Sequence, residues 1–330
     1  MSRTVHCLSA DKDSAASVSS SVSVTVPATT ANIGPGFDCL GAALSLYNHF
    51  HFTPFTPLSD SPPYQITVVG KEAKRVNTGA SNLVYRAFLK CYERIEKTPP
   101  PIHIKIRLGV PLSRGLGSSS TAIVGGIVGA NALAGSPLDD AALAELANEI
   151  EGHPDNVVPA LLGGAQLAAM AKGRLQICDL AWHKSVTPVV IIPDFEVSTA
   201  DARQVLPSKY SRADAIFNAA HLGLLLRGLA TGNGEWISGG MSDRIHQPYR
   251  KKLITAYEEV RRAALQAGAW GLVISGSGPT LMALTSPDTA DAVRESMLSV
   301  WQNQPFAIEA HCLQLDTKGA VAEAVGPSSL

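Results

Sequence analysis

Apolar and polar residues alternate with a period of two in several stretches of this chain, a pattern typical of half-buried β-strands. The clearest case is 102–108, where four aliphatic residues are separated by polar or charged ones in the order Ile-His-Ile-Lys-Ile-Arg-Leu. The stretches 22–26, 44–55 and 66–69 predict further strands. The first part of the chain is therefore expected to contain a β-sheet with one buried face.

Apolar residues three and four positions apart lie on one face of an α-helix, and this spacing predicts helices at 81–96, 122–135 and 141–150. We expect Ser81 to cap the first helix, and Asp139 or Asp140 to cap the third. The helices and strands together predict a mixed α and β architecture for this half.

The pattern changes near Trp182. The run 186–192 is apolar throughout, which predicts a buried strand. Further helices and strands alternate beyond it and predict a compact α+β sandwich, with helices at 213–230, 251–266 and 289–301 and strands at 270–274, 281–284 and 306–313.

These changes divide the chain into three parts. Residues 1–21 are polar and rich in Ser and Ala, so we expect a disordered tail. Two domains are expected to follow, at 22–181 and 182–330. The tail is alternatively a transit peptide, although Asp11, Asp13 and the scarcity of Arg weaken that interpretation.

The stretch 111–121 contains the strongest candidate chemistry. Gly115 and Gly117 can adopt positive φ, and the serines that follow them open the apolar helix at 122–135. A glycine loop that leads from a strand into a buried helix N-terminus favours phosphate, because free N–H groups and the helix dipole attract anions. The loop lacks the Gly-Lys-Ser/Thr ending of a Walker motif, and Ser120 replaces the third glycine of a dinucleotide fingerprint. A flexible Gly/Ser linker is the alternative, but the flanking strand and helix disfavour it.

Composition narrows the classes of function. The 330-residue chain is 45% hydrophobic and 17% charged, carries a net charge of −1 and contains no basic block, so nucleic acid and anionic membranes are unexpected partners. No segment has 18 consecutive apolar residues, which argues against a membrane span. The five cysteines form no CxxC pair, as expected of free thiols in a reducing compartment.

Three more segments combine glycine or proline with polar groups. The stretch 27–38 contains Asn32 and Asp38, and 275–280 forms a third glycine loop. The stretch 151–156 reads Glu-Gly-His-Pro-Asp-Asn, just after the helix that carries Glu145 and Glu149.

The order and wording of the motifs at 27–38, 111–121 and 275–280 resemble the GHMP kinases, which phosphorylate small molecules. Within that superfamily the chain is most similar to the homoserine kinases, on the motifs Pro-Ala-Thr-Thr-Ala-Asn-Ile-Gly-Pro-Gly-Phe-Asp and Gly-His-Pro-Asp-Asn. The lysine of mevalonate-type members is missing between 22 and 48, and so is the Gly-Glu-His of galactokinase-type members.

The resemblance implies a two-domain α+β fold. A left-handed β-α-β unit in the N-terminal domain would hold the phosphate loop, and the C-terminal domain would be a ferredoxin-like α/β sandwich. It also implies the activity, which is transfer of the γ-phosphoryl group of ATP to the side-chain hydroxyl of L-homoserine in threonine biosynthesis. Mg²⁺ is the expected cofactor, a homodimer the expected assembly, and the cytoplasm the expected compartment, or a plastid if 1–21 is a targeting remnant.

The resemblance also assigns the site residues by position. The ATP-binding residues would be Pro111, Leu112, Ser113, Arg114, Gly115, Leu116, Gly117, Ser118, Ser119, Ser120 and Thr121. Ser119 and Glu149 would bind Mg²⁺, with Glu145 as the competing ligand, since spacing alone does not separate the two glutamates. Arg203 and Arg250 would bind the substrate carboxylate, because guanidinium groups pair with planar anions.

The remaining polar residues would hold the other end of the substrate. Asn32, Asp38, His153 and Asp155 are expected around its amino group and hydroxyl, and Asn156 near the reacting hydroxyl. The residues expected to act in catalysis are Ser119, Glu149, Asn156 and Arg203. No general base is evident; Asp155 is the one alternative. Two other functions stay open: another GHMP kinase with a small amino-alcohol or polyol substrate, and an inactive member that binds a ligand.

Overall fold

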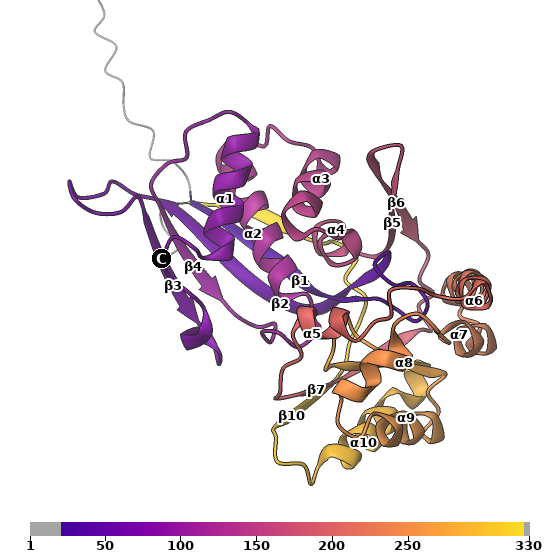
Figure 1. Cartoon of the computed structure of the whole chain (residues 1–330). Helices are drawn as coiled ribbons and strands as arrows, with labels where there is room; N and C mark the ends of the chain where they lie inside the picture. Colours follow the sequence, from indigo (N-terminus) through magenta and orange to yellow (C-terminus); the bar gives the residue numbers. More distant parts are fainter. Residues whose placement is uncertain (1–20, 327–330) are drawn as a thin grey trace, which may run out of the picture.

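The computed structural model describes residues 21–326 and contains two β-sheets with helices packed against them (Figure 1). The first sheet has seven strands: β1 (Ser21–Ala31), β2 (Leu40–Pro54), β3 (Tyr64–Val69), β4 (Ile102–Arg107), β5 (Ala165–Ala171), β6 (Arg174–Leu180) and β11 (Val321–Val325). The second has four: β7 (Thr187–Pro193), β8 (Gly271–Ile274), β9 (Leu281–Thr285) and β10 (Ile308–Cys312). Of the predicted tail, only Ser21 lies within the described residues.

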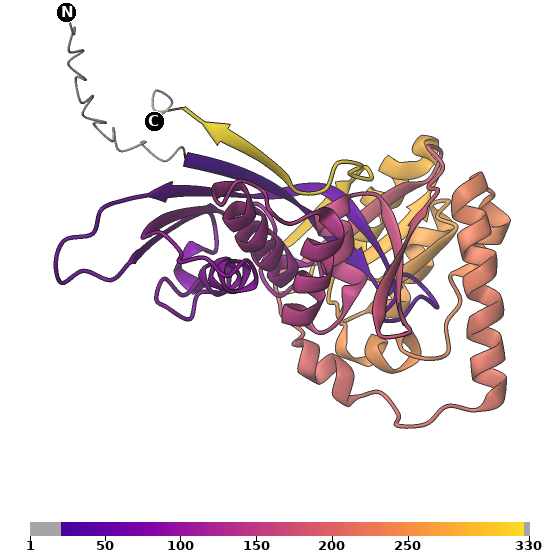
Figure 2. The same ribbon diagram turned by 90° about the horizontal axis from the view of Figure 1, so that it is seen from above.

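Helices cover one face of the first sheet, as Figures 1 and 2 show. They are α1 (Leu83–Arg94), α2 (Ser118–Leu133), α3 (Asp140–Glu151) and α4 (Pro154–Leu162). The alternating aliphatic residues of β1 and β4 point into this core, and their polar neighbours face away. Two helical glycines let α2 pack tightly, because a Cβ at Gly125 or Gly129 would lie 2.5 and 2.3 Å from the rings of Phe50 and Phe52.

The phosphate loop follows a β-α-β unit. Strands β3 and β4 are parallel, and α1 lies between them in the chain. Residues 111–117 then connect the C-terminal end of β4 to the start of α2. Helix α1 begins one residue later than its predicted cap would require. Asn82, rather than Ser81, accepts hydrogen bonds from the N–H groups of Val84 and Tyr85. An amide at the N-cap satisfies the same free donors that a serine would.

The second sheet has the strand order β10-β7-β9-β8 and is buried on both faces. Val189 and Ile191 of β7 pack with α9 (Tyr257–Gln266) and α10 (Ala290–Trp301), whereas Val190 and Ile192 face the core shared with the first domain. This double burial explains why β7 is apolar throughout. Helices α6 (Arg212–Thr231) and α7 (Gly234–Gly240) close the shared core, and the shorter elements are η1 (Ala73–Arg75), α5 (Thr199–Gln204), α8 (Gln247–Arg250), η2 (Lys251–Leu253) and η3 (Pro287–Thr289).

One strand of the predicted second domain, 182–330, lies in the first sheet. After β10 the chain returns to the first sheet, where β11 pairs antiparallel with β1, with Ser21 opposite Val325. Figure 2 shows this yellow strand beside the indigo one. A short exposed strand at the end of a chain carries little pattern, so the sequence did not reveal this crossover. Within residues 21–326, no helix combines the length and the apolarity needed to cross a membrane.

Candidate active site

The phosphate loop is held between two other glycine motifs. Gly115 and Gly117 have φ of +76° and +67°, in the left-handed region that favours glycine. A Cβ at Gly117 would lie 1.9 Å from Thr29 Oγ1, and one at Gly115 would lie 2.2 Å from the carbonyl oxygen of Ser275. Thr29 N–H donates to the Leu116 carbonyl at 3.1 Å, and Ser275 Oγ donates to the Gly115 carbonyl at 2.7 Å. The loop therefore has one fixed conformation between the two domains.

One cleft collects most of the residues that the sequence singled out. It lies where the phosphate loop, the N-terminus of α4, α5 and α8 meet. The lining residues are Asn32, Asp38, Ser113, Gly115, Gly117, Ser118, Ser119, Ser120, Glu151, His153, Asp155, Asn156, Thr199, Arg203, Arg250, Gly276 and Ser277.

The carboxylate beside the phosphate loop belongs to Glu151. Ser119 Oγ and Ser120 Oγ donate to Glu151 Oε1 at 2.8 and 3.1 Å. Glu149, the predicted metal ligand, does not line the cleft; its carboxylate is exposed and accepts a hydrogen bond from Arg94. Glu145 is exposed and lies one turn earlier than Glu149, on the same side of α3. Neither of the two weighed glutamates is therefore placed to share an ion with Ser119.

The direction of each glutamate explains this correction. Residues two positions apart in an α-helix point roughly 200° away from each other, so Glu149 and Glu151 project from opposite sides of α3. The helix extends to Glu151 before Gly152 ends it with φ +91°. The sequence signal was present, because Glu151 opens the polar stretch 151–156, but the predicted helix ended one residue too early to include it.

Asp155, His153 and Asn156 form a buried polar group at the start of α4. His153 Nδ1 lies 2.8 Å from Asp155 Oδ1, and this hydrogen bond raises the pKa of His153 above its usual value. Asp155 Oδ2 is buried and has no hydrogen-bond partner among residues 21–326. Thr29 Oγ1 donates to Asn156 Oδ1 at 2.7 Å, which leaves the Asn156 amide oriented by the first domain. A buried carboxylate oxygen without a partner favours a cationic ligand at this place.

Arg203 and Asp38 form a two-pronged ion pair across the cleft, with Nη2–Oδ1 and Nη1–Oδ2 distances of 2.8 and 2.9 Å. The hydrogen bonds to Asp38 raise the pKa of Arg203 further above its usual value. Asp38 is oriented in turn by Asn32, whose Oδ1 accepts its N–H at 2.8 Å. Two predicted substrate-binding residues thus neutralise each other, and a ligand with both charges can replace each partner of the pair.

Arg250 is the second predicted carboxylate-binding residue, and it is only 2% exposed. Its Nε donates to the Ala202 carbonyl at 3.0 Å, and its Nη1 to the Gly276 carbonyl at 3.1 Å. Among residues 21–326, no carboxylate lies within ion-pair distance of it. A buried cation without a counter-ion is costly, so this position favours an anionic ligand.

Not every residue of the predicted ATP-binding stretch faces the cleft. The Arg114 guanidinium turns away, donating to the Pro193 carbonyl at 3.0 Å and forming ion pairs with Asp194 and Glu196. Leu116 is fully buried between the domains. Thr121 uses its hydroxyl within the protein, donating to the Ser118 carbonyl at 2.8 Å. These side chains hold the loop, and only their backbone belongs to it.

A second cavity adjoins the cleft at Ser113, Ser118 and Ser119. It has a volume of about 380 Å³ and lies between α1, α2 and the segment after η1. Its lining mixes aliphatic side chains with amides, including Val76, Asn77, Asn82, Leu83, Val84, Ile106, Leu108 and Leu112. The sequence did not single out this cavity, because its walls come from four separate segments.

Comparison with known proteins shows the family of this chain. The model of the GHMP kinases N terminal domain matches residues 82–164, and that of the GHMP kinases C terminal matches 224–303. The homoserine kinase of Trichodesmium erythraeum is 59% identical over 303 residues, covering 92% of this chain and 98% of the relative. The chain belongs to the homoserine kinase family. The homoserine kinase of Nostoc punctiforme is likewise 59% identical, over 92% of this chain and 99% of its own.

A solved structure of a homoserine kinase has the same fold. The enzyme of Cytophaga hutchinsonii superposes with a TM-score of 0.84 at 29% identity, covering 97% of this chain and 100% of its own. The GHMP kinase fold implied by the sequence motifs, with its N- and C-terminal domains, is therefore confirmed.

Proposed function

We propose that this protein transfers the γ-phosphoryl group of ATP to the side-chain hydroxyl of L-homoserine, giving O-phospho-L-homoserine for threonine biosynthesis. One observation carries the proposal. The phosphate loop faces a cleft that holds two arginines together with three carboxylates, and one of these, Asp155, has a buried oxygen without a hydrogen-bond partner among residues 21–326. Opposite charges in one small cleft suit a zwitterionic amino acid, whereas a sugar offers neither charge.

ATP would bind with its phosphates on the loop and its base in the second cavity. The N–H groups at the start of α2 and the dipole of that helix favour the phosphates. The adjoining cavity at Val76, Asn82 and Leu83 offers apolar walls for a flat ring and amide groups for its edge. The two sites meet at Ser118 and Ser119, where the triphosphate would pass from one to the other.

Mg²⁺ would be held by Ser119 and Glu151. Their oxygens already lie 2.8 Å apart, and oxygen ligands are what this ion prefers. Among the described residues, no group of three or more His, Cys, Asp or Glu side chains is arranged to hold a metal. Two protein oxygens fit an ion that arrives with the nucleotide phosphates and water. When bound, the ion would neutralise negative charge on the transferred group.

The substrate would lie between the arginines and Asp155. Its carboxylate would pair with Arg203 and Arg250, and its ammonium group with Asp38 and the open Oδ2 of Asp155. The hydroxyl would then lie near Asn156, which is oriented by Thr29. Asp155 is already hydrogen-bonded to His153, so we assign it to binding rather than to proton abstraction. The hydroxyl oxygen would bond to the γ-phosphorus as the bond to ADP breaks, and the hydroxyl proton would pass to an oxygen of the transferred phosphoryl group.

An ADP-release assay with Mg·ATP tests the function, with homoserine, mevalonate, galactose and threonine compared at equal concentrations. We expect kcat/KM for homoserine to exceed the others by at least about a hundredfold, because only an amino acid uses both charges. Equal or faster turnover of mevalonate or galactose would contradict the assignment. No turnover of any of them, with homoserine still binding, would favour an inactive ligand-binding member.

We also propose a homodimer and a cytoplasmic location, both from family resemblance. Light scattering during gel filtration tests the first, with about twice the 34.6 kDa of the chain expected. Fusion of residues 1–21 to a fluorescent protein tests the second, since import into a plastid would identify the segment as a targeting peptide.

A further inference from the structure

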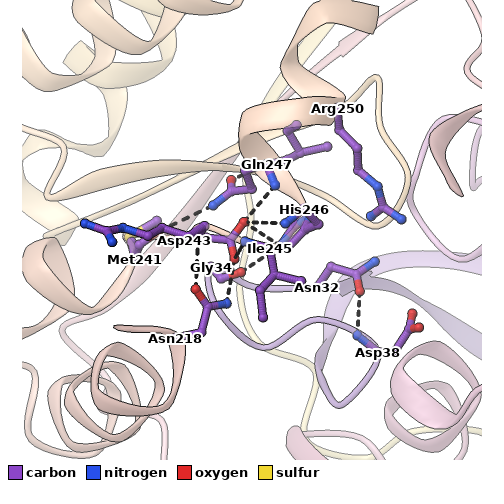
Figure 3. A network of polar contacts seen from close by, with 12 residues as sticks. Asn32, Gly34, Asp38, Asn218, Met241, Asp243, Ile245, His246, Gln247 and Arg250 are labelled. Carbon is purple, nitrogen blue, oxygen red and sulfur yellow. Dashed lines mark hydrogen bonds and ion pairs between the residues drawn. The ribbon is translucent and has the colours of Figure 1, made fainter. Parts of the chain in front are cut away.

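A buried histidine, His246, holds the turn that carries Asn32 and Asp38. Its Nε2 lies 2.7 Å from the carbonyl oxygen of Gly34, and the side chain is fully buried. A carbonyl oxygen can only accept, so the hydrogen must be on Nε2. The contact joins residues 212 positions apart in the sequence, one from each domain. Figure 3 shows His246 between this turn and Arg250.

The turn begins and ends at residues with a left-handed backbone conformation. Asn32 and Asp38, its first and last residues, have φ of +59° and +54°. Asn and Asp adopt this region more readily than other non-glycine residues, so the sequence permits the turn and contacts with its neighbours fix its position. Phe37 of the same turn stacks on the His246 ring, with ring centroids 5.2 Å apart and 23° between the planes. The histidine therefore supports the turn through both a hydrogen bond and a ring contact.

The position of His246 is fixed from behind by Asp243. This carboxylate accepts hydrogen bonds from the N–H groups of residues 245, 246 and 247 at 2.7–2.9 Å, and from Asn218 Nδ2 at 2.7 Å. These bonds appear as the dashed lines around Asp243 in Figure 3. Four N–H groups donate to this one buried carboxylate and restrict the movement of segment 243–250. The position of His246 therefore determines the position of the turn that it contacts.

The same segment carries Arg250, one helical turn after His246. Arg250 lies over the Phe37 ring at 4.9 Å and donates to the Gly276 carbonyl, which also accepts from Asn32 Nδ2 at 3.0 Å. Segment 243–250 thus contacts the turn at two places, through His246 at Gly34 and through Arg250 at Phe37. We propose that His246 is a positioning residue for the substrate, setting the distance between Asp38 on the first domain and Arg250 on the second.

This inference rests on the proposed function, because the distance matters only for a zwitterion. The ammonium and carboxylate groups of an α-amino acid are attached to one carbon atom, so their separation is fixed. Loss of the His246–Gly34 bond would let the turn shift and would separate the two binding charges. Binding of the amino acid should weaken, whereas ATP, which contacts neither group, should be bound as before.

Two amide variants test the proposal. His246→Gln places an amide nitrogen near the position of Nε2, whereas His246→Asn is too short to reach Gly34. We expect the Asn variant to raise KM for homoserine about tenfold and the Gln variant to raise it less than about threefold, consistent with the loss of one buried hydrogen bond. KM for ATP should stay within about twofold in both. His103→Asn, at a histidine hydrogen-bonded to Thr67 between β3 and β4 and outside the cleft, is the control and should leave both constants unchanged.

A second substrate sharpens the test. With 4-hydroxybutyrate, which lacks the amino group, the Asn and Gln variants should differ less than about twofold in KM. The proposal is overturned if the Asn variant keeps the wild-type KM for homoserine, if KM for homoserine and ATP rise together, or if neither variant folds, since the contact would then serve folding alone. Wild-type protein that fails to phosphorylate homoserine would contradict the proposed function, and this inference with it.

Discussion

At the phosphate end of the cleft, the backbone groups belong to one continuous stretch, Gly115–Ser120, and one carboxylate, Glu151, lies beside it. At the other end the groups that face the ligand are side chains from four separate parts of the chain, Asp38, Asp155, Arg203 and Arg250. The first end is shaped by backbone conformation and by glycines that no other residue can replace. The second depends on how the two domains are set against each other. Substitutions should therefore affect the two ends in different ways.

The largest effect is expected from Gly117→Ala at the phosphate end. The new Cβ would lie 1.9 Å from Thr29 Oγ1, so the loop must move, and we expect kcat/KM to fall by about a thousandfold or more. Gly135→Ala is the matched control. Its φ is also positive, at +90°, but a Cβ there meets nothing within 4 Å.

Both alanine variants share the penalty for a left-handed backbone, about 1 kcal/mol, and only Gly117→Ala adds a clash. Thermal unfolding and steady-state kinetics measure the two consequences separately. Equal losses of activity in the two variants would show that the left-handed backbone, and not the clash with Thr29, lowers the activity. That result would contradict the claim that close packing shapes the phosphate end.

A smaller loss is expected from Glu151→Gln, which removes the carboxylate charge beside Ser119. We expect kcat to fall about a hundredfold and the Mg²⁺ concentration needed for half activity to rise. Glu149→Gln should leave both within about twofold, because that side chain is bonded to Arg94 outside the cleft. Titration of activity with Mg²⁺ checks both variants. The opposite ranking would return the metal ligand to Glu149.

At the substrate end, Asp155→Asn should change binding more than chemistry. The variant keeps a neutral oxygen in place but loses the charge for the ammonium group, so KM for homoserine should rise about tenfold or more, with a smaller change in kcat. If Asp155 were a general base, kcat would instead fall by about 10² to 10⁴. A large fall in kcat with 4-hydroxybutyrate as substrate would mean that Asp155 acts on the hydroxyl.

The smallest effect concerns pH. The hydrogen bond to Asp155 raises the pKa of His153 in the folded protein. A histidine with a raised pKa stabilises the fold while it is protonated, so this contribution is complete below the unfolded pKa near 6.5 and is lost as the pH rises through the folded value. Between pH 8 and 6, Tm of the wild type should therefore rise relative to His153→Gln, by about 2 °C or less. A difference in Tm that is the same at both pH values would contradict this.

The sequence predicted the features that local pattern encodes. Strands β1 to β4 follow from the alternation of apolar and polar residues, helices α1 to α3 from the helical spacing, and the phosphate loop from the glycines and serines at 111–121. The doubly buried strand β7 was also visible as an unbroken apolar run. Resemblance to a family was needed to bring Arg203 and Arg250 into the site, because a lone arginine on a helix is usually a solvated one.

The remaining features depend on contacts between distant residues. Glu151 was missed because the predicted helix ended at residue 150, whereas α3 includes Glu151 and directs its carboxylate to the phosphate loop. The return of β11 to β1 joins two strands about 300 positions apart, which no local pattern records. Arg114 looked like a phosphate ligand from its place in the loop, but its partners Asp194 and Glu196 come from the other domain.

The central claim is that the cleft binds both charges of an amino acid while its loop holds ATP. The most direct test compares kcat/KM of the wild type for homoserine and for two analogues. One analogue, 4-hydroxybutyrate, keeps only the carboxylate, and the other, 3-aminopropan-1-ol, keeps only the amine. We predict that each analogue loses at least about tenfold relative to homoserine, because each leaves one buried group without its partner. Equal values for homoserine and either analogue would contradict the account.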